Sequence, residues 1–125
     1  MARKRIYLTL LVLWVGITFL LTSMPDPGFD VPLPYADKLA HFGFYGVMGF
    51  LCAMWRRECG GSAGGAVLFA LAFIAFAGAV DEAHQQWIPG RSMDVVDWFA
   101  DAAGGGIGAL FSAFLPPLLP FLLTE

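Results

Sequence analysis

The side chains best suited to chemistry gather in one short polar segment of an otherwise apolar chain. Residues 81–94 (DEAHQQWIPGRSMD) contain four charged residues and a histidine, although only 14% of the chain is charged and 58% is hydrophobic. Asp97 and Asp101 follow inside the next apolar run. Carboxylates and imidazoles act as general acids and bases and as metal ligands. Charge inside a bilayer is costly and marks a functional site by default. The interpretation of this segment therefore depends on whether the elements around it span a membrane.

The composition predicts one all-α membrane domain rather than a soluble one. A soluble domain carries about 25% charged residues, whereas this chain has 14% and a mean hydropathy of +0.71. Its apolar runs are near the roughly 17–25 residues that a spanning helix needs. The sequence therefore predicts a single domain over residues 1–125 with four transmembrane helices, at roughly 6–22, 39–55, 63–80 and 95–115. The first is expected to remain uncleaved, since no small-x-small cleavage site follows it.

The basic residues predict the orientation of these spans. Five of the seven Lys and Arg residues precede the first span or lie between the second and third (Arg3, Lys4, Arg5, Arg56 and Arg57). Cytoplasmic loops carry the excess of Lys and Arg, so both chain ends are predicted to be cytoplasmic. Eight of the ten acids belong to the opposite, outward side. Cys59 lies in the predicted cytoplasmic loop, where a disulfide is not expected.

Two local patterns predict how the third and fourth spans are joined and packed. Pro89-Gly90 suits a turn with proline first and glycine at positive φ. Ser92 is predicted to be the helix N-cap, which would place Asp94 in the first turn of the fourth span. Gly104 and Gly108 form a Gly-x-x-x-Gly pattern, which lets a second helix approach closely.

Helical spacing predicts that the polar residues of three helices lie on facing stripes. Residues spaced by three or four positions share one face of a helix, and the candidates follow this spacing within each helix. Because all three stripes begin at the outward membrane edge, one shared, outward-facing, acid-rich pocket explains them best. The predicted pocket residues are Asp37, Lys38, His41, Tyr45, Asp81, Glu82, Gln85, Arg91, Asp97 and Asp101.

Purely structural roles remain open for each part of this set. Asp37 and Lys38 fit a solvated helix start, His41 fits a hydrogen bond to a neighbouring helix, and His84 fits a solvated loop. Asp97 and Asp101 fit a pairing with Lys38 or Arg91 that holds helices together.

The pocket carries more acids than bases, and this excess needs compensation. Six carboxylates, with Asp94 among them, face only Lys38 and Arg91. Crowded carboxylates stay ionised only when something compensates them: protonation, a metal ion or a cationic ligand group. His41 with His84 and the acids could hold zinc or a harder cation, but the spacing is not diagnostic. Catalytic residues, metal and cofactor are therefore left unassigned.

The chain resembles the VanZ-like family, which is named for a teicoplanin-resistance protein. The resemblance rests on Asp37-Lys38-x-x-His41-x-x-x-Tyr45, on Asp81-Glu82-x-x-Gln85 with Pro89-Gly90-Arg91-Ser92, and on Asp97 with the glycines from Gly104. Many members have Asn at the position of Asp101, so this chain has an additional carboxylate there. The resemblance implies a multipass protein of the bacterial cytoplasmic membrane, in the cell envelope, with a link to glycopeptide resistance. It implies no particular reaction.

Three functions remain open at this point. The first is an envelope protein whose pocket recognises a headgroup or another lipid-linked ligand. The second is a membrane-embedded enzyme, metal-dependent or not, in which Asp81, Glu82 or Asp97 acts as acid, base or metal ligand and Arg91 orients an anion. The third is a proton- or cation-coupled transporter. The bilayer is the expected partner, an oligomer is left open, and a net charge of −3 offers no basic surface for nucleic acid.

Overall fold

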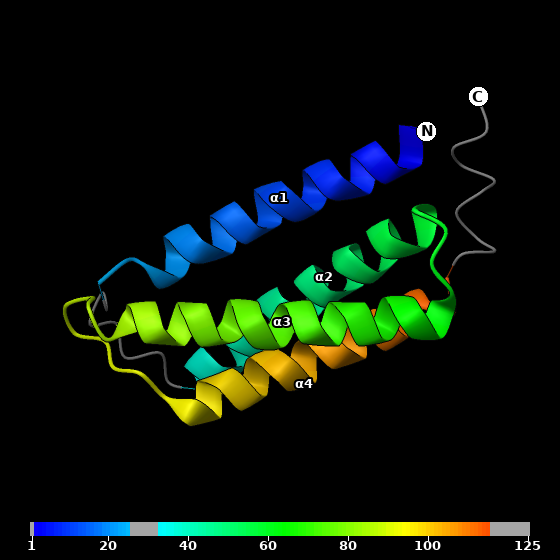
Figure 1. Cartoon of the computed structure of the whole chain (residues 1–125). Helices are drawn as coiled ribbons and strands as arrows, with labels where there is room; N and C mark the ends of the chain where they lie inside the picture. Colours follow the sequence, from blue (N-terminus) through cyan, green and yellow to red (C-terminus); the bar gives the residue numbers. More distant parts are fainter. Residues whose placement is uncertain (1, 26–32, 116–125) are drawn as a thin grey trace.

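In the part of the chain that the structure describes, four helices lie lengthwise beside one another (Figure 1). The computed structural model describes residues 2–25 and 33–115. The helices, in chain order, are α1 (Ala2–Thr22), α2 (Ala36–Glu58), α3 (Ala63–Gln85) and α4 (Val95–Ser112). These described residues form no strand, so the all-α prediction and the four predicted helices are confirmed. The ends of the predicted domain, residues 1 and 116–125, lie outside the described part.

Helix α3 continues past the predicted end of the third span into the polar segment. It ends at Gln85 rather than near residue 80, so Asp81 and Glu82 lie in its last turns. His84 is therefore helical, and its assignment to a loop is wrong. The start of α3 is capped by Ser62, whose hydroxyl accepts a hydrogen bond from the Gly65 amide at 3.1 Å.

The connection between α3 and α4 contains the predicted turn but not the predicted cap. Arg91 N donates to Ile88 O at 3.1 Å across Pro89 and Gly90, and Gly90 has a φ of 77°. This arrangement matches a proline-first turn with glycine at positive φ. The N-cap of α4 is Asp94, whose carboxylate accepts from the Val96 amide at 2.8 Å. The assignment of this role to Ser92 is wrong, because α4 begins two residues later.

Helices α2 and α4 pack backbone against backbone through glycines. A Cβ built at Gly104 would collide with the Phe42 carbonyl, and one at Gly108 with the Gly46 carbonyl. Gly49 meets the backbone of Gly105 in the same way. The Gly-x-x-x-Gly prediction is confirmed, and its partner is α2. Close approach of this kind needs the absence of side chains on both surfaces.

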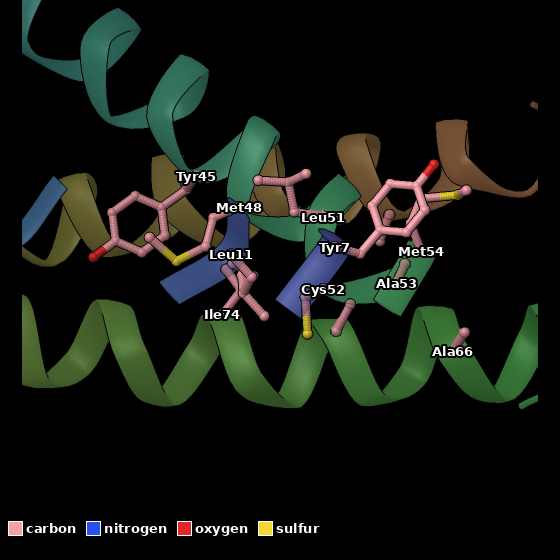
Figure 2. Close-up of a cluster of buried hydrophobic side chains, with 12 residues drawn as sticks. Tyr7, Leu11, Tyr45, Met48, Leu51, Cys52, Ala53, Met54, Ala66 and Ile74 are labelled. Carbon is pink, nitrogen blue, oxygen red and sulfur yellow. The ribbon is translucent and has the colours of Figure 1, made fainter. Parts of the chain in front are cut away.

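The apolar core lies between α1, α2 and α3. Tyr45 and Met48 of α2 pack with Leu11 of α1 and Ile74 of α3, and Cys52 completes the centre (Figure 2). Tyr45 is the one member of this group whose polar atom extends toward the acidic end of the bundle.

Two tryptophans join neighbouring helices through hydrogen bonds from the indole N–H to backbone carbonyl oxygens. Trp14 Nε1 donates to Phe44 O at 2.8 Å, which joins α1 to α2. Trp98 Nε1 donates to Ala75 O at 2.9 Å, which joins α4 to α3. A buried indole N–H usually finds such a partner, and here both partners lie on another helix.

Helices α1 and α3 expose large apolar side chains away from the bundle. Val12, Leu20, Leu68 and Phe76 are each more than half exposed. By length and composition, Ala2–Thr22 and Ala63–Gln85 are apolar enough to cross a membrane. An exposed apolar surface of this extent marks an interaction with lipid or protein.

Candidate functional site

All ten predicted site residues lie at the same end of the bundle. This is the end where α1 and α3 finish and where α2 and α4 begin (Figure 1). A cavity of about 710 Å³ opens there between the helices and the segment that precedes α4. Its polar wall contains six of the ten residues: Asp37, His41, Tyr45, Gln85, Arg91 and Asp97. Its apolar wall includes Leu21, Leu33 and Phe44.

Lys38 is the centre of an ion-pair network at the mouth of the cavity. Its Nζ lies 3.0 Å from Asp97 Oδ1 and 3.1 Å from both Asp94 Oδ2 and Asp37 Oδ2. The Asp97 side chain is 9% exposed, and that of Lys38 is 25% exposed. The structural alternative for Asp97, a pairing with Lys38 that joins α2 to α4, is therefore present. The second oxygen of Asp97, Oδ2, lies 3.9 Å from His41 Nε2.

Asp94 joins α3, α4 and Lys38 at this mouth. Its carboxylate caps α4 and accepts from Lys38, while its backbone N–H donates to Glu82 Oε2 at 3.0 Å. The amide of Val96, and then Lys38, hold the pKa of the Asp94 carboxyl below its usual range. Asp94 is consequently ionised at neutral pH, in the form that caps a helix best.

His41 and Asp101 form a hydrogen-bonded pair below the network. His41 Nδ1 lies 2.8 Å from Asp101 Oδ1, and both side chains are buried. Gly78 of α3 gives this pair its room, because a Cβ there would lie 2.9 Å from Asp101 Oδ2. An ionised Asp101 accepts the bond from Nδ1–H, which leaves the lone pair of Nε2 free to act as base or ligand.

Asp81 ties three helices together. Its carboxylate accepts from Tyr45 Oη at 2.9 Å and from Thr22 Oγ1 at 2.6 Å. Thr22 and the buried Thr18 both line the cavity from α1. Neither threonine is among the predicted site residues. Their spacing of four residues, near the outer end of an apolar helix, is the signal that could have found them.

Two basic groups at this end do not face the carboxylates. Arg91 Nε donates to Met24 O at 3.0 Å and makes no ion pair with the described acids. The ring of His84 packs against Phe19 of α1, with the ring centroids 4.8 Å apart. The alternative in which Arg91 pairs with Asp97 or Asp101 is therefore not formed by the described residues, and the group that could hold a metal ion does not include His84.

Within the described residues, the group best placed to hold a metal ion is His41, Glu82 and Asp97. Each contributes one ligand atom, and the three atoms lie within 4.8 Å of one another. The residues come from α2, α3 and α4, and all three are buried. One imidazole and two carboxylates form a ligand set that suits a divalent cation.

These features define a class: a small all-α protein of membrane character, with a polar cavity at one end of a glycine-packed four-helix bundle. The chain belongs to the VanZ/LLP1 family, whose model matches residues 6–116. This match confirms the resemblance drawn from the sequence motifs. No curated protein and no solved structure matches the chain. The family and the two apolar helices together indicate a membrane protein.

Proposed function

We propose that this VanZ/LLP1 protein spans the bacterial cytoplasmic membrane four times, with both ends in the cytoplasm and the cavity open to the outside. The apolar faces of α1 and α3 support this arrangement. The placement of the basic residues supports it too, since Arg56 and Arg57 lie at the end of α2 away from the cavity. A link with glycopeptide resistance is part of the same proposal, and it is supported by the family resemblance alone.

The two ends of the bundle offer matched thiol probes of this orientation. Cys59 is exposed in the loop after α2, and Ser92 is exposed beside the cavity. In intact cells, a membrane-impermeant maleimide is expected to label a Ser92→Cys, Cys59→Ser variant and to spare Cys59 of the wild type. After permeabilisation both should react. Labelling of Cys59 in intact cells would overturn the proposed orientation.

We propose further that the cavity recognises the headgroup of an envelope lipid or lipid-linked molecule. The observation behind this proposal is the cavity itself, whose acidic residues stand beside Leu21, Leu33 and Phe44. A volume of about 710 Å³ lies within the range of small-molecule pockets. A wall that is charged on one side and apolar on the other suits an amphiphile, whose headgroup meets the acids while its chain meets the apolar residues.

Native mass spectrometry with a lipid panel tests this recognition. Purified protein is mixed with phosphatidylethanolamine, phosphatidylglycerol or a polyprenyl phosphate, and the retained lipid is measured. We expect retention to depend on the headgroup and Asp97→Asn to reduce the retention of the preferred lipid at least tenfold. Glu58→Gln makes the same acid-to-amide change at the other end of α2 and should leave retention unchanged. Equal retention of all lipids, or equal loss in both variants, would refute headgroup recognition.

A membrane-embedded enzyme is the second candidate, and the His41–Asp101 pair favours it. A general base is commonly oriented by a third group that fixes its tautomer, and His41 both lines the cavity and contacts a buried carboxylate. The lipid panel separates the two functions. A binding protein returns the lipid with its mass unchanged, whereas an enzyme returns a product of altered mass.

A further inference from the structure

Glu82 carries a buried carboxylate oxygen that the described residues leave without a hydrogen bond. The residue is 3% exposed. Its Oε2 accepts from the Asp94 amide, while its Oε1 has no partner in the described part of the chain. Buried polar atoms are nearly always satisfied, and an orphaned carboxylate oxygen is among the costliest exceptions. This oxygen is therefore a candidate ligand atom.

The unpartnered oxygen faces His41. Glu82 Oε1 lies 3.8 Å from His41 Nδ1, and His41 Nε2 lies 3.9 Å from Asp97 Oδ2. Both separations exceed hydrogen-bond length. The separation between His41 Nε2 and Asp97 Oδ2 is close to an edge of a metal coordination sphere, since ligands about 2.1 Å from a tetrahedral ion are roughly 3.4 Å apart. The widest edge of the group, up to 4.8 Å, would have to shorten by about 1.4 Å to reach this length.

The groups around these ligands match the surroundings of metal sites. A metal-bound histidine usually donates its other ring N–H to a carboxylate, which fixes its orientation. Asp101 stands in that position, 2.8 Å from His41 Nδ1. Lys38 and the Asp94 amide hold the other oxygens of Asp97 and Glu82. His41, Glu82 and Asp97 are thus each oriented by a contact to a group outside the candidate ligand set.

We propose that His41, Glu82 and Asp97 bind a divalent cation, Mn²⁺ or Zn²⁺, at the base of the cavity. His41 Nε2, Glu82 Oε1 and Asp97 Oδ2 are the ligand atoms. The ion offsets the carboxylates that Lys38 does not reach and leaves a coordination position on the cavity side, where His41 and Asp97 form part of the wall. The chemistry favours these cations because imidazole suits zinc and carboxylates suit manganese, whereas Mg²⁺ prefers oxygen ligands alone.

Direct metal binding tests the proposal without reference to lipid or activity. Protein stripped with a chelator is titrated with Mn²⁺ by calorimetry, and the bound ion is examined by electron paramagnetic resonance. We expect one ion per chain and at least a tenfold loss of affinity in Glu82→Gln. Glu58→Gln is the matched control, since it makes the same acid-to-amide change at the end of α2 away from the cavity. Its Mn²⁺ affinity should stay within threefold of the wild type.

Two outcomes would overturn the metal site. One is a wild-type protein that binds no ion in the titration, and the other is an equal loss of affinity in Glu82→Gln and Glu58→Gln. If Glu82→Gln does not fold, the melting temperature decides: Mn²⁺ should raise that of the wild type but not that of Asp97→Asn. A Zn²⁺ titration uses the Cys59→Ser background, because the exposed Cys59 thiol is itself a zinc ligand. A failure to find metal binding would not refute headgroup recognition, because the lipid panel measures lipid retention and not metal.

Discussion

Replacing Gly104 or Gly108 by alanine is expected to destabilise the bundle by about 2 kcal/mol or more, at the upper part of the range for overpacked interiors. The added Cβ would collide with the carbonyl of Phe42 or Gly46. Backbone atoms cannot rotate out of the way as a side chain can, so α2 and α4 must separate along their shared surface. Unfolding in a titration of sodium dodecyl sulfate, followed by far-ultraviolet circular dichroism, measures the loss.

Gly43 provides the matched control for this prediction. It belongs to the same helix as Gly46, but a Cβ built on it meets nothing within 4 Å. Alanine there should leave the stability unchanged or raise it by up to about 1 kcal/mol, since glycine loses more conformational freedom on folding. If Gly104→Ala and Gly43→Ala unfold at the same detergent fraction, the backbone contact between α2 and α4 does not hold the bundle together.

Replacing Lys38 by methionine is expected to cost about 3 kcal/mol, the lower end for breaking a buried ion pair by removing one partner. The substitution leaves the carboxylates of Asp94 and Asp97 without their shared cation, and the Asp97 side chain is only 9% exposed. The lower end applies because the Lys38 side chain is itself 25% exposed and partly screened by solvent. The same detergent titration measures the change.

A double-mutant cycle separates the ion pair from the loss of a long side chain. Lys38→Met with Asp97→Asn should cost less than the sum of the two single changes, because the double variant contains no uncompensated charge at Asp97. Lys4→Met is the control at an exposed position of α1 and should change the stability by no more than about 0.5 kcal/mol. Additive costs in the cycle would mean that Lys38 and Asp97 do not stabilise each other.

The sequence alone predicted the parts of the fold that depend on local patterns. Apolar runs of spanning length predicted the four helices, and Pro89-Gly90 predicted the turn before α4. Gly104 and Gly108 predicted a close helix contact, although not which helix makes it. The spacing of three polar stripes predicted that their residues meet at one end of the bundle, because i, i+4 periodicity fixes the face on which each side chain lies.

The remaining features depend on contacts between helices, which no local pattern encodes. The partner of Arg91 is the backbone carbonyl of Met24, two residues after the end of α1, and a carbonyl has no signature in the sequence. Thr22 joins the site because α1 ends beside Asp81. Asp94 takes the cap that Ser92 was expected to provide because it also contacts Lys38 and Glu82. For the N-cap, tertiary contacts decided between two residues that local propensity left nearly equivalent.

The contact between Arg91 and the Met24 carbonyl has a consequence for how fast charged solutes reach the cavity. The guanidinium of Arg91 donates to this carbonyl and not to the carboxylates at the mouth of the cavity. In the described part of the chain, Lys38 is therefore the one Lys or Arg that forms an ion pair with them. A negatively charged mouth concentrates cations near it and repels anions. Because the Debye length is about 10 Å at 0.1 M salt, that steering acts at low ionic strength and fades as salt is added. Association rates of charged ligands will therefore vary with salt far more than their dissociation rates, which depend on contacts inside the cavity.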